Sequence, residues 1–279
     1  ITSDNYNDIT ATVTVNAVNI NIPWPEVSAL TLKQNAKYGD TNADTLKGFS
    51  TGTVNATAAD TVTGKFSVKN AAATPDAGTT TVTLVFTTDA GQSVTGSFEK
   101  DYTIPAVAKR SVTLTSKTVS KTYDGTALTN GDVSVTGDGF YGEEGATWTV
   151  TGTQLDAGTS KNTFTYELKA GTKAANYEIS KVEGDLTVNK ITTPIVITAN
   201  SKSKTYDGTA LTDWTYTVTG LEADDSHEFD VDMTADSKIT DVGTKANVIA
   251  KVDGVEVTTT KTNAVNNYLV TVINGELEV

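Results

Sequence analysis

The sequence Ser-Lys-Thr-Tyr-Asp-Gly-Thr-Ala-Leu-Thr occupies residues 120–129 and returns unchanged at residues 203–212. An identical stretch of ten chemically varied residues marks equivalent points in two copies of one structural module. Two shorter pairs of motifs follow the decamers in the same order: Asp156-Ala-Gly-Thr159 and Asp241-Val-Gly-Thr244, then Asn176-Tyr177 and Asn267-Tyr268. The chain is therefore expected to be built from tandem modules.

These motifs divide the chain into three expected modules, at 17–108, 109–190 and 191–279. The first is more distant in sequence, because Ala36-Lys-Tyr38-Gly39-Asp40 is a diverged counterpart of the decamer and no Asn-Tyr pair closes the module. Residues 1–16 contain the pair Asn5-Tyr6 and continue as alternating threonine and apolar residues. That pattern predicts the closing strand of a preceding module or an N-terminal extension.

Composition excludes several classes of partner and site. The net charge is −13, and Arg110 is the single arginine among 21 basic residues, so nucleic acid, which needs clustered positive charge, is not an expected partner. The acidity is typical of a solubilising surface. No cysteine is present, which excludes disulfides and thiolate sites. No apolar run is long enough to cross a membrane, so this segment is not expected to insert into one, and a secreted protein would carry its targeting sequences outside it.

Alternation of apolar residues with threonine or charge predicts β-strands along the second module. The expected strands are Val112–Thr115, Val133–Thr136, Ala146–Thr153, Thr163–Lys169, Tyr177–Ser180 and Asp185–Val188. Trp148 here, Phe66 in the first module and Phe229 in the third hold one recurring place before the Asp-x-Gly turn, so each is expected in a core. No stretch has helical periodicity.

Strands at this spacing, separated by Gly, Asn and Asp clusters, predict an all-β chain of tandem immunoglobulin-like antiparallel β-sandwich modules. Modules with a β-grasp-like sheet are the alternative, which the lack of an amphipathic helix disfavours.

In the first module, Thr81–Thr87 alternates as a strand, and Pro75–Thr79 carries residues typical of a turn. The segment Pro23-Trp24-Pro25 is expected at an edge, because its prolines lack the amide hydrogen that a central strand donates. Ala106–Arg110 is expected to be a linker.

The motifs of the last two modules resemble the Tyr-Asp-Gly repeats of large bacterial surface proteins. They are Lys121-Thr-Tyr123-Asp124-Gly125, Asp156-x-Gly158-Thr159 and Asn176-Tyr177, with the matching set in 191–279. The first module is similar to the related repeats with a Tyr-Gly-Asp signature, through Ile22-Pro-Trp24-Pro25, Tyr38-Gly39-Asp40, Gly64-Lys-Phe66 and Pro75-x-Ala77-Gly78-Thr79. The resemblance covers nearly the whole chain. It implies an adhesin-like, modular extracellular protein of the bacterial cell surface with immunoglobulin-like repeats. It does not imply a catalytic site or a known ligand.

Two functions are expected from these observations. The first is a non-catalytic stalk or spacer, in which each module needs only a stable core and a short linker. The second is direct binding of a host or cell-surface glycan or protein, which requires an exposed aromatic surface peculiar to one module. Trp24 and Trp214 are the non-repeated candidates for that surface. A monomer without cofactors is expected in both cases.

The repeated motif itself is expected to be structural. Tyr123 and Tyr206 each precede an Asp-Gly pair typical of a tight turn, and each is expected to bury its ring, as corner tyrosines do in immunoglobulin-like folds. The complete structural set is Tyr123, Asp124, Gly125, Tyr206, Asp207, Gly208, Asn176, Tyr177, Asn267 and Tyr268.

Catalysis is not expected. His227 is the single histidine and lies in a polar turn, with no placed serine and acid to form a triad. The pair Glu143-Glu144 lies beside glycines in an expected turn, whereas glycoside hydrolysis needs two acids across a cleft.

Two further alternatives concern metal and covalent links. Calcium prefers oxygen ligands, which Asp224, Asp225, Asp230 and Asp232 supply, although the last two alternate with core residues as on the solvent face of a strand. Lys117 and Asn189 are candidates for an isopeptide bond between the first and last strands of the second module.

Overall fold

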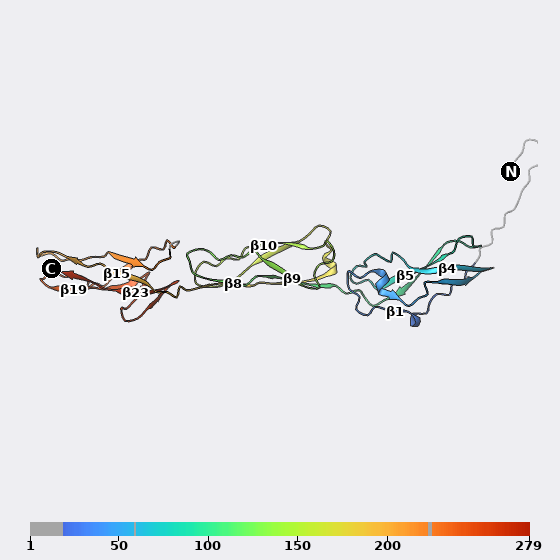
Figure 1. The fold of residues 1–279 in the computed structure, drawn as a ribbon, viewed down its shortest axis with the longest axis horizontal. Helices are drawn as coiled ribbons and strands as arrows, with labels where there is room; N and C mark the ends of the chain where they lie inside the picture. The colour runs from blue at the N-terminus through green and yellow to red at the C-terminus, as the bar shows by residue number, and fades with distance from the viewer. Residues whose placement is uncertain (1–18, 59, 223–224) are drawn as a thin grey trace, which may run out of the picture. The chain divides into compact units, whose positions relative to one another are not determined.

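The computed structural model of the chain describes residues 19–58, 60–222 and 225–279, so the strand expected at 1–16 lies outside it. The described chain is nearly all β, with several antiparallel sheets (Figure 1). It forms two compact units. The first holds the described residues up to Val112 together with Gly137–Glu144 and Gly171–Glu178, and the second holds Thr113–Thr136, Gly145–Ala170 and Ile179–Val279.

The first unit begins with short elements and continues as a four-stranded antiparallel sheet of order β3-β4-β5-β6. Its described elements before Arg110 are the 3₁₀-helix η1 (Val27–Ala29), β1 (Thr31–Leu32), α1 (Asn42–Thr45), β2 (Leu46–Lys47), β3 (Thr53–Thr57), β4 (Thr61–Val68), β5 (Thr81–Thr88) and β6 (Ser97–Thr103). Strand β1 pairs with β2. Figure 1 shows β4 and β5 side by side in this unit.

The core of the first unit is built on one face of this sheet. In β5, Val82, Leu84 and Phe86 are buried at alternate positions, which confirms the strand predicted at Thr81–Thr87. Phe66 of β4 lies opposite Phe86, with ring centroids 5.2 Å apart, and its predicted core position is confirmed.

Two predictions for this unit are wrong. The one-turn helix α1 was not expected, because one turn is too short to show periodicity, but Thr41 and Asp44 form a capping box in which each side chain accepts the other's backbone N–H. The expected linker Ala106–Arg110 is part of the fold. The apolar side chain of Val107 is buried in the core of the unit. The next residue is also held in the fold, since the Ala108 amide donates to the Ala36 carbonyl at 2.8 Å.

Residues 110–189 contain eight strands and a 3₁₀-turn. They are β7 (Arg110–Ser116), β8 (Val119–Thr122), β9 (Val133–Gly137), β10 (Ala146–Val150), β11 (Gly158–Lys161), β12 (Phe164–Leu168), η2 (Ala174–Asn176), β13 (Tyr177–Val182) and β14 (Asp185–Asn189). All six predicted strands are confirmed. Strands β8 and β11 were missed, because their exposed residues are polar on both faces and show no apolar alternation.

The described residues of the range 195–278 contain ten strands. They are β15 (Ile195–Ala199), β16 (Lys202–Ser203), β17 (Tyr216–Thr219), β18 (Val231–Met233), β19 (Thr244–Asn247), β20 (Ile249–Val252), β21 (Val255–Glu256), β22 (Asn263–Val265), β23 (Tyr268–Ile273) and β24 (Gly275–Glu278). Strand order repeats between the two segments: β13-β7-β9 corresponds to β23-β15-β17, β11-β14-β8 to β19-β24-β16, and β10-β12 to β18-β20.

Parallel pairs occur among the described strands: β8 with β14, β16 with β24, and β15 with β23. The all-β prediction with antiparallel sheets is confirmed at this level, and the parallel pairs are a feature that the sequence analysis did not predict. Alternation within a strand reports which face is buried and carries no information on the direction of the neighbouring strand. As a consequence, the start of each decamer lies beside the last strand of its own segment.

The core of the second unit includes the parallel pair β15 and β23, where Ile195 lies opposite Val270 and Ile197 opposite Val272, all four buried. Phe229 is buried in the same core, as predicted. Among the described residues no helix has the length and apolar character needed to span a membrane.

Candidate functional site

The Asn-Tyr motif of residues 176–177 contacts the turn at residues 76–78 inside the first unit. Asn176 is fully buried; its Oδ1 accepts a hydrogen bond from the Ala77 amide at 2.9 Å, and its Nδ2 donates to Asp76 Oδ1 at 2.9 Å. Lys173 Nζ lies 2.9 Å from the same carboxylate. The bond from Asn176 and then that from Lys173 hold the pKa of Asp76 below its ordinary value.

Two buried tyrosines meet edge to face next to this amide. The ring centroids of Tyr38 and Tyr177 are 5.7 Å apart with planes at 84°. Both phenols donate to the Glu144 carboxylate, Tyr38 at 2.8 Å. Burial, and then the bond to Glu144, raise the pKa of Tyr177 to about 12 and the pKa of Tyr38 above its ordinary value. We name this set the first junction: Tyr38, Asp76, Ala77, Glu144, Asn176 and Tyr177.

Charged groups surround the first junction. Lys37 Nζ lies 2.7 Å from Asp138 Oδ1, and this contact, with the Ser111 amide, lowers the pKa of Asp138 to about 2. Arg110 donates to the Gly139 carbonyl at 2.8 Å and also to the Asp138 carbonyl. The single arginine of the chain is therefore a structural residue that fixes the loop after β9.

The same arrangement recurs inside the second unit. Asn267 is buried; its Oδ1 accepts from the Ala157 amide at 2.7 Å, and its Nδ2 donates to Asp156 Oδ1 at 3.0 Å. Both groups of the amide thus contact an Asp-Ala-Gly turn, as Asn176 does. A side-chain amide suits this position, because it presents one acceptor and two donors in one plane.

The tyrosines of the second unit repeat the edge-to-face contact. The ring centroids of Tyr123 and Tyr268 are 5.5 Å apart with planes at 81°. Tyr268 donates to Asp225 Oδ2 at 2.7 Å, and its pKa is raised by burial and by this bond. The buried Asp225 also accepts the His227 amide at 3.0 Å. We name this set the second junction: Tyr123, Asp156, Ala157, Asp225, Asn267 and Tyr268.

The two junctions differ in their surroundings. In the second, Phe229 and His227 lie 5.1 and 5.2 Å from Tyr268 between ring centroids, and Tyr123 belongs to the apolar core of the unit. The ion pair made by Lys173 in the first junction has no counterpart, because Ala264 holds the position three residues before the second Asn-Tyr pair. The first junction thus has an ion pair beside its asparagine, whereas the asparagines and tyrosines of both junctions are buried.

The second decamer lies outside both junctions. Tyr206 is 57% exposed, whereas its copy Tyr123 is 9% exposed, so the predicted burial of Tyr206 is wrong. A turn of this sequence leaves the ring in solvent unless other residues cover it. Val242, in the third Asp-x-Gly turn, is 76% exposed. We name this surface the free face: Tyr206, Asp207, Asp241, Val242 and Gly243.

Each decamer orders its own turn. Asp124 accepts from Lys121 Nζ at 2.6 Å and from the Thr126 amide at 2.9 Å, and Asp207 repeats these bonds with Lys204 at 2.7 Å and Thr209 at 2.9 Å. The lysine, followed by the amide, lowers the pKa of Asp124 to about 2 and the pKa of Asp207 further below its ordinary value. The acid of the Tyr-Asp-Gly motif therefore stabilises its own turn.

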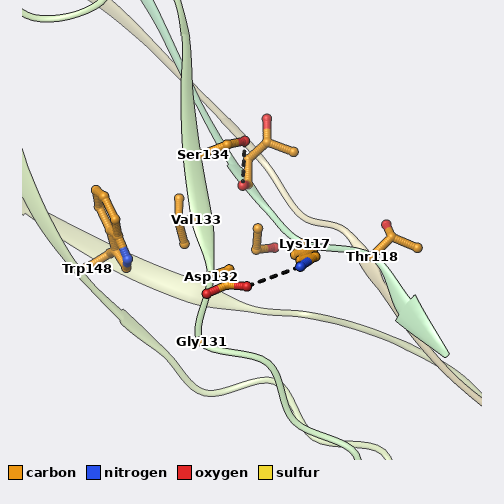
Figure 2. Close-up of a pocket in the computed structure, with 9 residues that line it drawn as sticks. Lys117, Thr118, Gly131, Asp132, Val133, Ser134 and Trp148 are labelled. Carbon is orange, nitrogen blue, oxygen red and sulfur yellow. Dashed lines mark hydrogen bonds and ion pairs between the residues drawn. The ribbon is translucent and has the colours of Figure 1, made fainter. Parts of the chain in front are cut away.

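A shallow groove of about 650 Å³ lies on the second unit. Figure 2 shows Trp148 at one side of it and the ion pair of Lys117 with Asp132, 3.3 Å long, at the other. Trp148 is 36% exposed, so its predicted core position is wrong. Strand β10 pairs with β12 in a two-stranded sheet, and three of its five residues, Thr147, Trp148 and Thr149, are exposed.

The other two tryptophans, Trp24 and Trp214, differ in their exposure to solvent. Trp24 is half-buried and packs on Phe66, with ring centroids 5.3 Å apart. Trp214 is 56% exposed.

The candidate catalytic residues have structural partners. His227 is half-buried, and its Nε2 lies 2.8 Å from Asp253 Oδ2. Glu144 accepts two phenols in the first junction, while Glu143 is exposed.

The described calcium candidates do not form a metal-binding cluster. Asp224 lies outside the described residues, and Asp230 and Asp232 are exposed. The described part of the chain contains no group of three or more acids or histidines arranged to hold a metal ion. Lys117 Nζ pairs with the Asp132 carboxylate, and Asn189 is an exposed residue of β14 that lies opposite Thr122 of β8.

Comparison of the chain with models of known protein families, with curated proteins and with solved structures gives no match.

Proposed function

We propose that the chain is a non-catalytic segment of a bacterial cell-surface, adhesin-like protein and acts as a stalk or spacer of stacked β modules. One observation carries this proposal. Two junctions of the same design occur along the chain, and in each an Asn-Tyr motif of one expected module contacts the Tyr and Asp-x-Gly motifs of the preceding one.

The design of the junctions suits a spacer. An amide bonded to both an N–H and a carboxylate resists rotation about either bond, and an edge-to-face tyrosine pair excludes water beside it. In a linear array each module contacts only its neighbours, so the stiffness of the array depends on such contacts. Catalysis, by contrast, needs unengaged acids or bases at a cleft, whereas the junction carboxylates accept phenols and amides.

The proposal includes an immunoglobulin-like fold for the modules and an extracellular location for the protein. Modules of 80 to 90 residues with paired antiparallel strands and repeated Tyr-Asp-Gly motifs are consistent with immunoglobulin-like sandwiches on an extracellular protein. A cysteine-free, acidic chain is compatible with that location.

The experiment is small-angle X-ray scattering of the monomeric chain. A compact globule of this length has a radius of gyration of about 19 Å, and a spacer is expected to exceed it clearly. The double variant Asn176→Ala/Asn267→Ala is the matched comparison and should show a wider spread of distances. A radius near the globular value contradicts the spacer function.

A second candidate function, binding of a glycan or protein, is favoured by the groove beside Trp148 (Figure 2). An exposed indole ring beside a hydrogen-bonding ion pair is a surface on which a sugar ring can stack. Binding of surface glycans or host proteins that is lost in Trp148→Ala and kept in Trp214→Ala would support it. Equal loss in both variants, or no binding, contradicts it.

A further inference from the structure

The free face has the parts of a junction but lacks its partner. Within residues 19–58, 60–222 and 225–279, the Val242 amide and the Asp241 carboxylate make no hydrogen bond, and the Tyr206 ring has no aromatic contact. At the second junction the equivalent groups, those of Ala157, Asp156 and Tyr123, are all engaged.

The backbone of the free face already has the geometry of a filled junction. Gly243 has φ +147° where Gly158 has +153°, and Gly208 has φ +75° where Gly125 has +78°. The Asp207 turn holds the same bonds as the Asp124 turn. A partner would therefore meet a preorganised surface, and little ordering entropy would oppose its binding.

The two filled junctions define the chemistry of that partner. Each supplies a buried asparagine amide for the turn, a tyrosine ring for the decamer tyrosine, and a carboxylate that accepts a phenol, Glu144 or Asp225. In the described chain the pairs Asn176-Tyr177 and Asn267-Tyr268 are already engaged, so a second copy offers neither.

We infer that the free face is a docking site for the Asn-Tyr end of a further β module of this kind, one that presents an asparagine, a tyrosine and a buried carboxylate. The Val242 amide donates to the asparagine Oδ1, the Asp241 carboxylate accepts from its Nδ2, and the Tyr206 ring packs edge to face on the tyrosine. This inference rests on the proposed spacer function, because it adds a module to the array.

The test extends the full chain with a second copy of residues 189–279 after Val279, so that the natural connection of the second junction is reproduced. Hydrogen exchange is followed at the Val242 amide. In the unextended chain Val242 should exchange fast while Ala157 is protected. In the extended chain Val242 should slow at least about tenfold toward the rate of Ala157, because a bonded amide exchanges only when the junction opens.

The matched control carries Asn267→Ala in the appended copy alone, and the protection of Val242 should disappear. Slow exchange of the β23 amides in the appended copy shows that this copy has folded. If it has not folded, residues 106–190, which contain Asn176-Tyr177 and Glu144, are appended in its place. Fast exchange at Val242 beside a folded appended module overturns the inference. Failure of both appended modules to fold also overturns it, since the same sequences fold at the existing junctions.

Protection of Val242 that rises with the concentration of the unextended chain would identify a second copy as the occupant and would likewise overturn the inference. The spacer function is judged separately by scattering of the unextended chain. An elongated chain whose free face stays open refutes the inference alone, and a compact chain refutes the spacer function.

Discussion

The decamers at residues 120–129 and 203–212 are identical in sequence and alike in local structure, yet they differ in what covers them. In both, the aspartate bonds the lysine three residues before it, and the glycine has a positive φ. Tyr123 is nevertheless buried against Tyr268, and Tyr206 is exposed.

This difference separates two roles of the motif. Asp-Gly makes the turn in both copies, because the bonds of the aspartate and the conformational freedom of glycine are local. Burial of the tyrosine depends on an Asn-Tyr pair from elsewhere in the chain. The motif is therefore a structural turn that also presents an interface.

The largest difference is expected between Tyr123→Ala and Tyr206→Ala. Tyr123→Ala removes a buried aromatic ring and should destabilise the second unit by about 3–5 kcal/mol, whereas Tyr206→Ala should change its stability by less than about 0.5 kcal/mol. Urea unfolding of the full chain, followed through Trp148 and Trp214, measures both variants in the same unit. Equal costs would mean that the tyrosine acts through its own turn and not through the junction.

Removal of the amide should make the second junction resemble the free face. Asn267→Ala leaves the Ala157 amide and the Asp156 carboxylate without a partner, which should cost about 1–3 kcal/mol. Exchange of the Ala157 amide should rise toward that of Val242. Asn267→Asp keeps the acceptor but sets two carboxylates together, so it should not restore stability at neutral pH. Full rescue by aspartate would contradict the assigned bond from Asn267 to Asp156.

Acid should destabilise the first unit, because two of its carboxylates are stabilised in their charged form. Asp76 and Asp138 have folded-state pKa values below the ordinary 3.8, so their contribution is present above about pH 4 and is lost as the pH falls toward 2. Stability of the first unit should decline in this window, and added salt should weaken the ion pairs of Lys173 and Lys37. Asp76→Asn should flatten the decline. If Asp76→Asn lost as much stability at low pH as the unaltered chain, Asp76 would not be a source of the acid sensitivity.

Much of the fold could be predicted from the sequence. The six strands expected in residues 110–189 and the core positions of Phe66 and Phe229 follow from alternation, because burial on one face of a strand has period two. Trp148 obeys the same pattern, but its side chain is exposed. Alternation identifies a face and does not identify what covers it.

The junctions could be predicted only in part. The motifs were recognisable, but contact between the Asn-Tyr of one segment and the Asp-x-Gly of another depends on packing between distant residues. Glu144 and Asp225 were missed as phenol acceptors, because their spacing from the Asn-Tyr pairs differs. One signal was present: residues 17–108 keep Tyr38 and the turn but lack an Asn-Tyr pair, which indicates that the two motifs serve opposite ends of a module.

The smallest difference is expected at the glycines of the two decamers. Gly125 and Gly208 have φ of +78° and +75°, so alanine at either position must adopt a left-handed conformation that costs about 1–2 kcal/mol. A Cβ at residue 125 would lie 3.5 Å from Asp225 Oδ1, an ordinary contact distance, and a Cβ at residue 208 would meet nothing within 4 Å. Gly125→Ala and Gly208→Ala should therefore destabilise the second unit equally, within about 0.5 kcal/mol, by the same urea measurement. Because the tyrosine two residues earlier is expected to distinguish the copies strongly, equal costs here would show that the turn is autonomous and that the junction acts through the ring. A much larger cost at Gly125 would instead mean that the turn and Asp225 pack too closely for a methyl group, and that the backbone of the motif is itself part of the interface.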